Sequence, residues 1–74
     1  LSQTAQSMLD EVAELFLKTG SGPIRVTGFA DELGDPAYNQ ALSQRRADAV
    51  SQYLIASGVD ENTLQVSGLG IYSE

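Results

Sequence analysis

The sequence predicts an α/β fold, a two-layer α+β sandwich whose elements follow the order helix, strand, helix, strand. Three observations predict it. Apolar residues recur at helical spacing over 1–18 and 36–57, the runs 24–27 and 63–67 contain β-branched residues, and glycine, proline or polar clusters separate these segments. A strand–helix–strand unit of this length places its two strands parallel, joined by a right-handed crossover.

The first predicted helix and strand are separated by residues that end helices. Residues 1–18 carry apolar side chains three and four positions apart. Gly20 and Pro23 stop this pattern, because glycine fits the left-handed position after a helix and proline cannot continue one. The run 24–27 is the predicted strand, and we expect Gly28 to close it.

The second predicted helix covers residues 36–57. Asp35 is its predicted N-cap, and Pro36 fills the first helical position. Gly58 fits the left-handed position after its end, and a polar turn leads to the strand at 63–67, after which we expect irregular structure. Two short strands make a small sheet, so we expect residues 1–74 to be one domain truncated at both ends, lacking its first and last strands.

Composition and charge exclude several classes of function. The 74 residues allow one domain, and the net charge of −6, from 4 basic and 10 acidic residues, disfavours binding to nucleic acid or to an anionic membrane surface. No apolar run approaches the roughly 20 residues that a membrane span needs. The chain has no cysteine or histidine, which removes thiolate and imidazole chemistry from consideration.

An arginine interrupts the apolar side of the second predicted helix. On a wheel of about 100° per residue, Arg46 lies inside the apolar stripe, with Asn39 on the same side two turns earlier. A guanidinium directed at the sheet must find an anion, because an unpaired buried charge is costly. Asp31, in the loop between strand and helix, is the nearest candidate. The predicted stripe consists of Tyr38, Leu42, Ala49, Val50, Tyr53 and Leu54.

Two interpretations of this pair follow from the residues alone. Asp31 and Arg46 could form a structural ion pair, with Asn39 capping the loop. Alternatively, Arg46 could hold a ligand carboxylate by a forked pair of hydrogen bonds while Asp31 holds a ligand ammonium, as an amino acid would require. The space beyond the carboxyl ends of the strands, next to a helix N-terminus, is where open α/β sheets bind ligands.

Residues 28–50 carry a motif with several parts at fixed spacing. The stretch resembles the OmpA-like domain, the peptidoglycan-associating module of outer-membrane porins, peptidoglycan-associated lipoproteins and flagellar stator proteins. The family pattern is Gly-x-Thr-Asp, then Gly, Asn, Leu-Ser and Arg-Ala, with alanine here in place of the threonine. In this sequence it reads Gly28-Phe29-Ala30-Asp31, Gly34, Asn39, Leu42-Ser43 and Arg46-Ala47.

The resemblance implies non-covalent binding of the diaminopimelate residue in the stem peptide of peptidoglycan. Asp31 would hold the ligand's amine and Arg46 its carboxylate. It also implies a periplasmic domain attached to the outer membrane or cell envelope of a Gram-negative-type bacterium, without a cofactor, and with a homodimer or other envelope proteins as further partners. The other residues lining the implied pocket are Asn39 and Leu42, with backbone groups around Ala30 and Gly34.

Other functions have weaker support in the sequence. A structural or assembly domain is the alternative, with Asp31 and Arg46 as a fold-holding ion pair and bare strand edges pairing with another chain. We do not expect an enzyme, because Ser43 has no evident base on its helical face. We expect no metal site either, because Asp31, Glu32 and Asp35 lack the spacing of a calcium loop.

Overall fold

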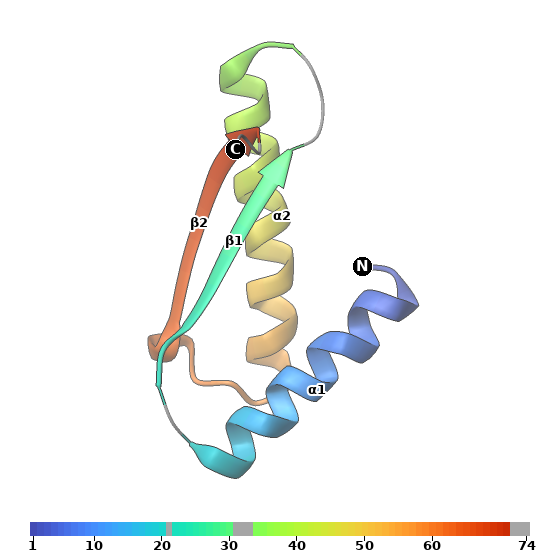
Figure 1. Cartoon of the computed structure of the whole chain (residues 1–74), viewed down its shortest axis with the longest axis vertical. Helices are drawn as coiled ribbons and strands as arrows, with labels where there is room; N and C mark the ends of the chain where they lie inside the picture. The colour runs from blue at the N-terminus through green and yellow to red at the C-terminus, as the bar shows by residue number, and fades with distance from the viewer. Residues whose placement is uncertain (21, 31–33, 72–74) are drawn as a thin grey trace.

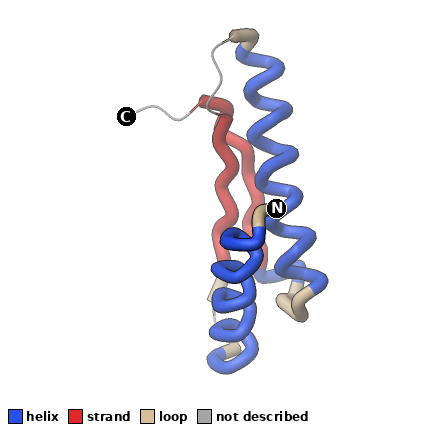
Figure 2. The backbone as a smooth tube through the Cα atoms, turned by 90° about the vertical axis from the view of Figure 1, so that its right-hand side faces the viewer, coloured by secondary structure: helices blue, strands red, loops and turns tan. Residues whose placement is uncertain are grey.

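Two helices and a two-stranded parallel sheet make up the computed structural model, which describes residues 1–20, 22–30 and 34–71 (Figure 1). Helix α2 covers one face of the sheet, and α1 lies at the end where the strands begin (Figures 1 and 2). The predicted fold class and element order are confirmed. The elements are α1 (Gln3–Thr19), β1 (Ile24–Ala30), α2 (Pro36–Ala56), the 3₁₀ helix η1 (Glu61–Thr63) and β2 (Leu64–Ile71).

The helix ends match the cap residues that the sequence predicted. The Asp35 side chain accepts a hydrogen bond from the Ala37 backbone N–H at 2.9 Å, and Pro36 is the first residue of α2. Gly20 adopts the left-handed conformation (φ 60°) after α1 and donates its N–H to the Phe16 carbonyl. These bonds satisfy backbone groups that a helix end leaves without an intrahelical partner.

Both strands extend further than the sequence predicted. Strand β1 continues past Gly28 to Ala30, and the residues after Ser67 continue β2 to Ile71 instead of forming irregular structure. Gly28 pairs with Gly68, yet Ala30 pairs with Ile71, so β2 carries an extra residue in a β-bulge. The bulge includes a glycine with φ 75°, Gly70, a conformation that favours a residue without a side chain.

The face of α2 that packs against the sheet differs from the predicted stripe. Tyr38, expected in the stripe, is 52% exposed, and Ala49 is exposed as well. Ser51, which is not part of the predicted stripe, is only 7% exposed. Relative to the predicted stripe, the buried face is shifted by about one residue along the helix. It consists mainly of small and polar side chains, namely Asn39, Ser43, Ala47, Ser51 and Leu54.

Close approach between backbones explains this choice of small side chains. A carbon added to Gly68 would lie 2.5 Å from the backbone nitrogen of Gln44 and 2.7 Å from Ser43 Oγ. A carbon added to Gly28 would lie 2.9 Å from the backbone nitrogen of Ala47 and would overlap the Ser43 carbonyl oxygen. Because α2 sits this close to both strands, large apolar side chains do not fit between them.

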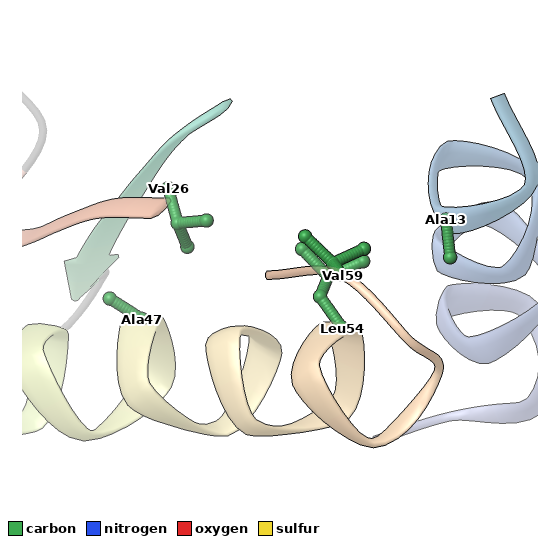
Figure 3. Packing of buried hydrophobic residues seen from close by; sticks show 5 residues of the cluster. All are labelled: Ala13, Val26, Ala47, Leu54 and Val59. Atoms are coloured by element: carbon green, nitrogen blue, oxygen red, sulfur yellow. The ribbon is translucent and has the colours of Figure 1, made fainter. Parts of the chain in front are cut away.

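A small apolar core joins α1 to the rest of the molecule (Figure 3). Its members come from both helices, from β1 and from the segment after α2, and in Figure 3 the leucine and the second valine lie between the α1 alanine and the pair formed by the other two. Half-buried side chains from α1, α2 and both strands surround the cluster. The buried members are Ala13, Val26, Ala47, Leu54 and Val59.

A hydrogen bond also links the two helices. The Tyr53 hydroxyl on α2 donates to the Asp10 carboxylate on α1 at 2.7 Å. This bond raises the pKa of Tyr53 above the ordinary value of a tyrosine, and burial and the negative charge of Asp10 act in the same direction. The protonated phenol is therefore the form that holds α1 against α2.

We expect the contribution of Tyr53 to stability to disappear at high pH. A group whose pKa is raised by folding stabilises the fold below its unfolded pKa, and this stability is lost as the pH rises through the folded pKa. Below about pH 10, the ordinary tyrosine value, the wild-type chain should be more stable than Tyr53→Phe, and the difference should shrink above it. Urea unfolding of both chains at pH 8 and pH 11 measures this.

Tyr38→Phe is the matched control for that experiment, because Tyr38 lies on the same helix and is half exposed. Its effect on the free energy of unfolding should be small at both pH values. A difference between wild type and Tyr53→Phe that stays constant from pH 8 to pH 11 would contradict the prediction.

Candidate functional site

Arg46 lies at the carboxyl end of β1, where the predicted site would be. Its Nη1 donates to the carbonyl oxygen of Phe29 at 3.0 Å, although the two residues come from different elements. The side chain is exposed, so the expectation that it lies within the buried stripe is wrong. Ala47 occupies that stripe instead, and Arg46 stands at its edge, where a guanidinium can stay hydrated and still reach the strand end.

Asn39 is the buried polar residue at the amino-terminal end of α2. Only 1% of it is exposed, and neither its amide nitrogen nor its amide oxygen has a hydrogen-bond partner among the described residues. Asn39 and Arg46 are seven positions apart, which is about two helical turns, so they project from the same side of α2. Buried amides nearly always have partners, so Asn39 is an exception that calls for an explanation.

The remaining predicted site residues lie around the same end of the sheet. Ala30 ends β1 and is 1% exposed, and Leu42 is half-buried on α2. Gly34 is exposed and directly precedes the N-cap of α2. Asp31 directly follows Ala30 in the chain but lies outside the described residues, so its pairing with Arg46 stays a prediction.

Sequence reasoning missed three polar side chains of α2 that bind the backbone of β2. Gln44 Oε1 accepts from the Gly68 N–H at 3.0 Å, and Gln40 Nε2 donates to the Gly68 carbonyl at 2.5 Å. Ser43 Oγ accepts from the Gly70 N–H at 2.8 Å and donates to the Gln40 carbonyl at 2.8 Å. We call Gln40, Ser43 and Gln44 the β2 clamp. The glycines of β2 were the sequence signal for these contacts, because residues without a side chain let a helix pack close to a strand.

Helix α1 carries an exposed apolar surface away from this site. Met8 is 63% exposed and Leu15 62%, and a shallow hollow of about 370 Å³ runs along them. A second hollow, of about 300 Å³, reaches from α1 to Ile24, the first residue of β1. The second hollow is therefore at the opposite end of β1 from Arg46, and neither hollow is lined by a residue of the predicted ligand site.

Residues 1–20, 22–30 and 34–71 contain neither a cluster of metal-binding side chains nor a membrane-spanning helix. Within these ranges, no three acidic, histidine or cysteine side chains lie close enough together to hold a metal ion. Neither helix in this part of the chain combines the length and the hydropathy that crossing a bilayer requires.

Comparison with known proteins gives consistent matches over nearly the whole chain. The sequence profile of the OmpA family matches residues 1–72. Outer membrane protein P5 of Haemophilus influenzae is 36% identical over 70 residues, which are 95% of this chain and 20% of that protein. The chain thus spans about a fifth of the length of this relative.

Solved structures agree with the sequence matches. The peptidoglycan-associated lipoprotein from Burkholderia pseudomallei superimposes with a TM-score of 0.89 and 31% identity, over 96% of this chain and 60% of that one. The periplasmic domain of Helicobacter pylori MotB gives a TM-score of 0.80 and 25% identity, over 99% of this chain and 50% of that one. These matches agree with the resemblance that residues 28–50 indicated.

Proposed function

The chain belongs to the OmpA family, and on that basis we propose that it binds peptidoglycan non-covalently through the diaminopimelate residue of the stem peptide. In this role it tethers an outer-membrane or envelope protein to the cell wall from the periplasmic side. The similarity to a peptidoglycan-associated lipoprotein supports the choice of polymer. The choice of diaminopimelate depends on the charges and amide groups at the end of β1.

The observation that carries the proposal is the buried amide of Asn39, which has no hydrogen-bond partner among residues 1–20, 22–30 and 34–71. Its oxygen can accept from an ammonium group, and its nitrogen can donate to a carboxylate. Arg46, on the same side of the helix, supplies a cation for the carboxylate, and Asp31 is proposed to supply an anion for the ammonium. One amino-acid centre carries both ligand groups, so it satisfies all three side chains together.

The polar groups of the backbone support the same ligand. The amino terminus of α2 brings the positive end of the helix dipole to this part of the molecule, which favours a carboxylate nearby. Gly34 is exposed and has no side chain, so its backbone groups are accessible to a ligand. The backbone around the buried Ala30 is proposed to complete the pocket from the strand end. Leu42 offers apolar contact for the methylene chain of diaminopimelate.

Retention on purified sacculi, with affinity measured by titration, tests the proposal. Arg46→Ala should weaken binding by about 30-fold or more, because the ligand carboxylate loses its charged partner. Arg46→Lys should bind with intermediate affinity, because an ammonium cannot form the forked pair. Free meso-diaminopimelate should compete with sacculi, whereas 1,5-diaminopentane, which has two ammonium groups on a methylene chain but no carboxylate, should not.

Arg45→Ala is the matched control, because Arg45 is the neighbouring exposed arginine on the same helix. It should leave retention unchanged. Equal retention of wild type, Arg45→Ala and Arg46→Ala would remove Arg46 from the site.

A structural role is the second candidate, and the Arg46–Phe29 bond favours it. That bond already ties α2 to the end of β1 within the chain. If the pair of Arg46 and Asp31 served the fold alone, Arg46→Ala would lower the melting temperature while the folded fraction kept its affinity for sacculi. Measuring stability and binding on the same sample therefore separates the two functions.

A further inference from the structure

The β2 clamp binds the strand just before its bulge and within the bulge itself. Two of its bonds hold the peptide groups at Gly68, just before the bulge, and the third holds the N–H of Gly70 within it. All three come from one turn of α2. The position of the bulge along the sheet is thus tied to the helix as well as to β1.

The bulge in turn sets where β1 ends. Beyond it, Ile71 pairs with Ala30, the last residue of β1 and the one before Asp31. The neighbouring residue, Phe29, presents its carbonyl oxygen to Arg46. A bulge re-aims the residues that follow it, so a shift at Gly70 would move the strand end relative to α2.

We propose that Gln40, Ser43 and Gln44 are positioning residues for the ligand site. They fix the position of the β1 end along the axis of α2. Groups at the strand end and side chains of the helix can then contact the same ligand. None of them needs to touch the ligand. This inference rests on the proposed function, because it concerns the geometry of the same site.

The direction of each hydrogen bond provides a sharp test. Gln40 donates to the Gly68 carbonyl, whereas Gln44 accepts from the Gly68 N–H. Replacing Gln40 by glutamate sets a carboxylate against a carbonyl oxygen and breaks the bond. Replacing Gln44 by glutamate keeps the acceptor, and Asp48→Asn is added because Gln44 also donates to Asp48 at 3.1 Å.

Gln52→Glu is the matched control, because Gln52 is exposed on the same helix and the substitution makes the same change of charge. Titration against sacculi should show that Gln40→Glu binds about tenfold more weakly than wild type, an amount equivalent to one lost hydrogen bond. Gln52→Glu and the double variant Gln44→Glu/Asp48→Asn should stay within about twofold of wild type.

A readout without ligand accompanies the titration. Hydrogen exchange at the Gly68 amide should accelerate in Gln44→Met and should stay slow in Gln44→Glu/Asp48→Asn, because only the second keeps an acceptor. Circular dichroism confirms that each variant is folded before its affinity is compared.

The possible outcomes separate the clamp from the proposed function. If the wild-type chain binds sacculi and folded Gln40→Glu binds as tightly as Gln52→Glu, the positioning role is overturned but the proposed function is not. Equal losses in Gln40→Glu and in the Gln44→Glu double variant would overturn it too, because the bond directions would then be irrelevant. Failure of the wild-type chain itself to bind sacculi would overturn the proposed function and this inference with it.

Discussion

Gly28→Ala is expected to lower the free energy of unfolding by about 3 kcal/mol or more, the upper end of the cost of overpacking a core. The added methyl group would overlap the Ser43 carbonyl oxygen and lie 2.9 Å from the Ala47 nitrogen. Both are backbone atoms, so no side chain can rotate away, and α2 would have to lift from the strands. Since small domains are stable by only about 5 to 15 kcal/mol, the loss is large.

Urea unfolding followed by circular dichroism measures this loss, and Gly20→Ala is its control. A carbon added to Gly20 meets nothing within 4 Å, and only the left-handed backbone (φ 60°) opposes it. That conformation costs an alanine about 1 kcal/mol. Equal losses in Gly28→Ala and Gly20→Ala would show that the contact between helix and strand does not limit stability.

Asn39→Leu is expected to stabilise the fold and to abolish ligand binding. The amide has two buried atoms without partners among the described residues, and each such atom costs about 1 to 3 kcal/mol of desolvation. Leucine has a similar size and no polar atoms, so we expect the free energy of unfolding to rise by about 2 kcal/mol. Binding to sacculi should be lost, because the proposed ligand then loses a donor and an acceptor.

Gln52→Leu separates this effect from a general gain in helix propensity. Gln52 is exposed on the same helix, so its replacement should change stability by less than about 0.5 kcal/mol and leave binding intact. A large loss of stability in Asn39→Leu would mean that the amide is satisfied in the folded protein. Binding that survives in Asn39→Leu would exclude Asn39 from the ligand site.

The helix ends could be predicted from the sequence because their chemistry is local. Asp35 caps α2 through a residue two positions away, and Gly20 closes α1 through one four positions away. The order of the elements and the parallel sheet followed from the spacing of the apolar runs. The structure places Arg46 at the end of β1, bonded to the Phe29 carbonyl, while its pairing with Asp31 stays a prediction.

The buried face of α2 could not be predicted, because hydropathy is a poor guide where backbones touch. Ser43 is fully buried and Tyr38 is half exposed, which is the reverse of their hydropathy. The reason lies in Gly28 and Gly68, which belong to other segments and come together only in the fold. The strand ends were missed for a related reason, since a bulge depends on bonds from α2 to β2.

The parallel pairing of β1 with β2 has a consequence for how the chain folds. Ile24 pairs with Leu64, so the whole of α2 lies between the two partners. Among the described residues β1 pairs with β2, and α2, whose buried face is small and polar, gains little from burying apolar surface before β2 has been made. We therefore expect β1, α2 and β2 to fold in one cooperative step, at a rate limited by closing this long loop.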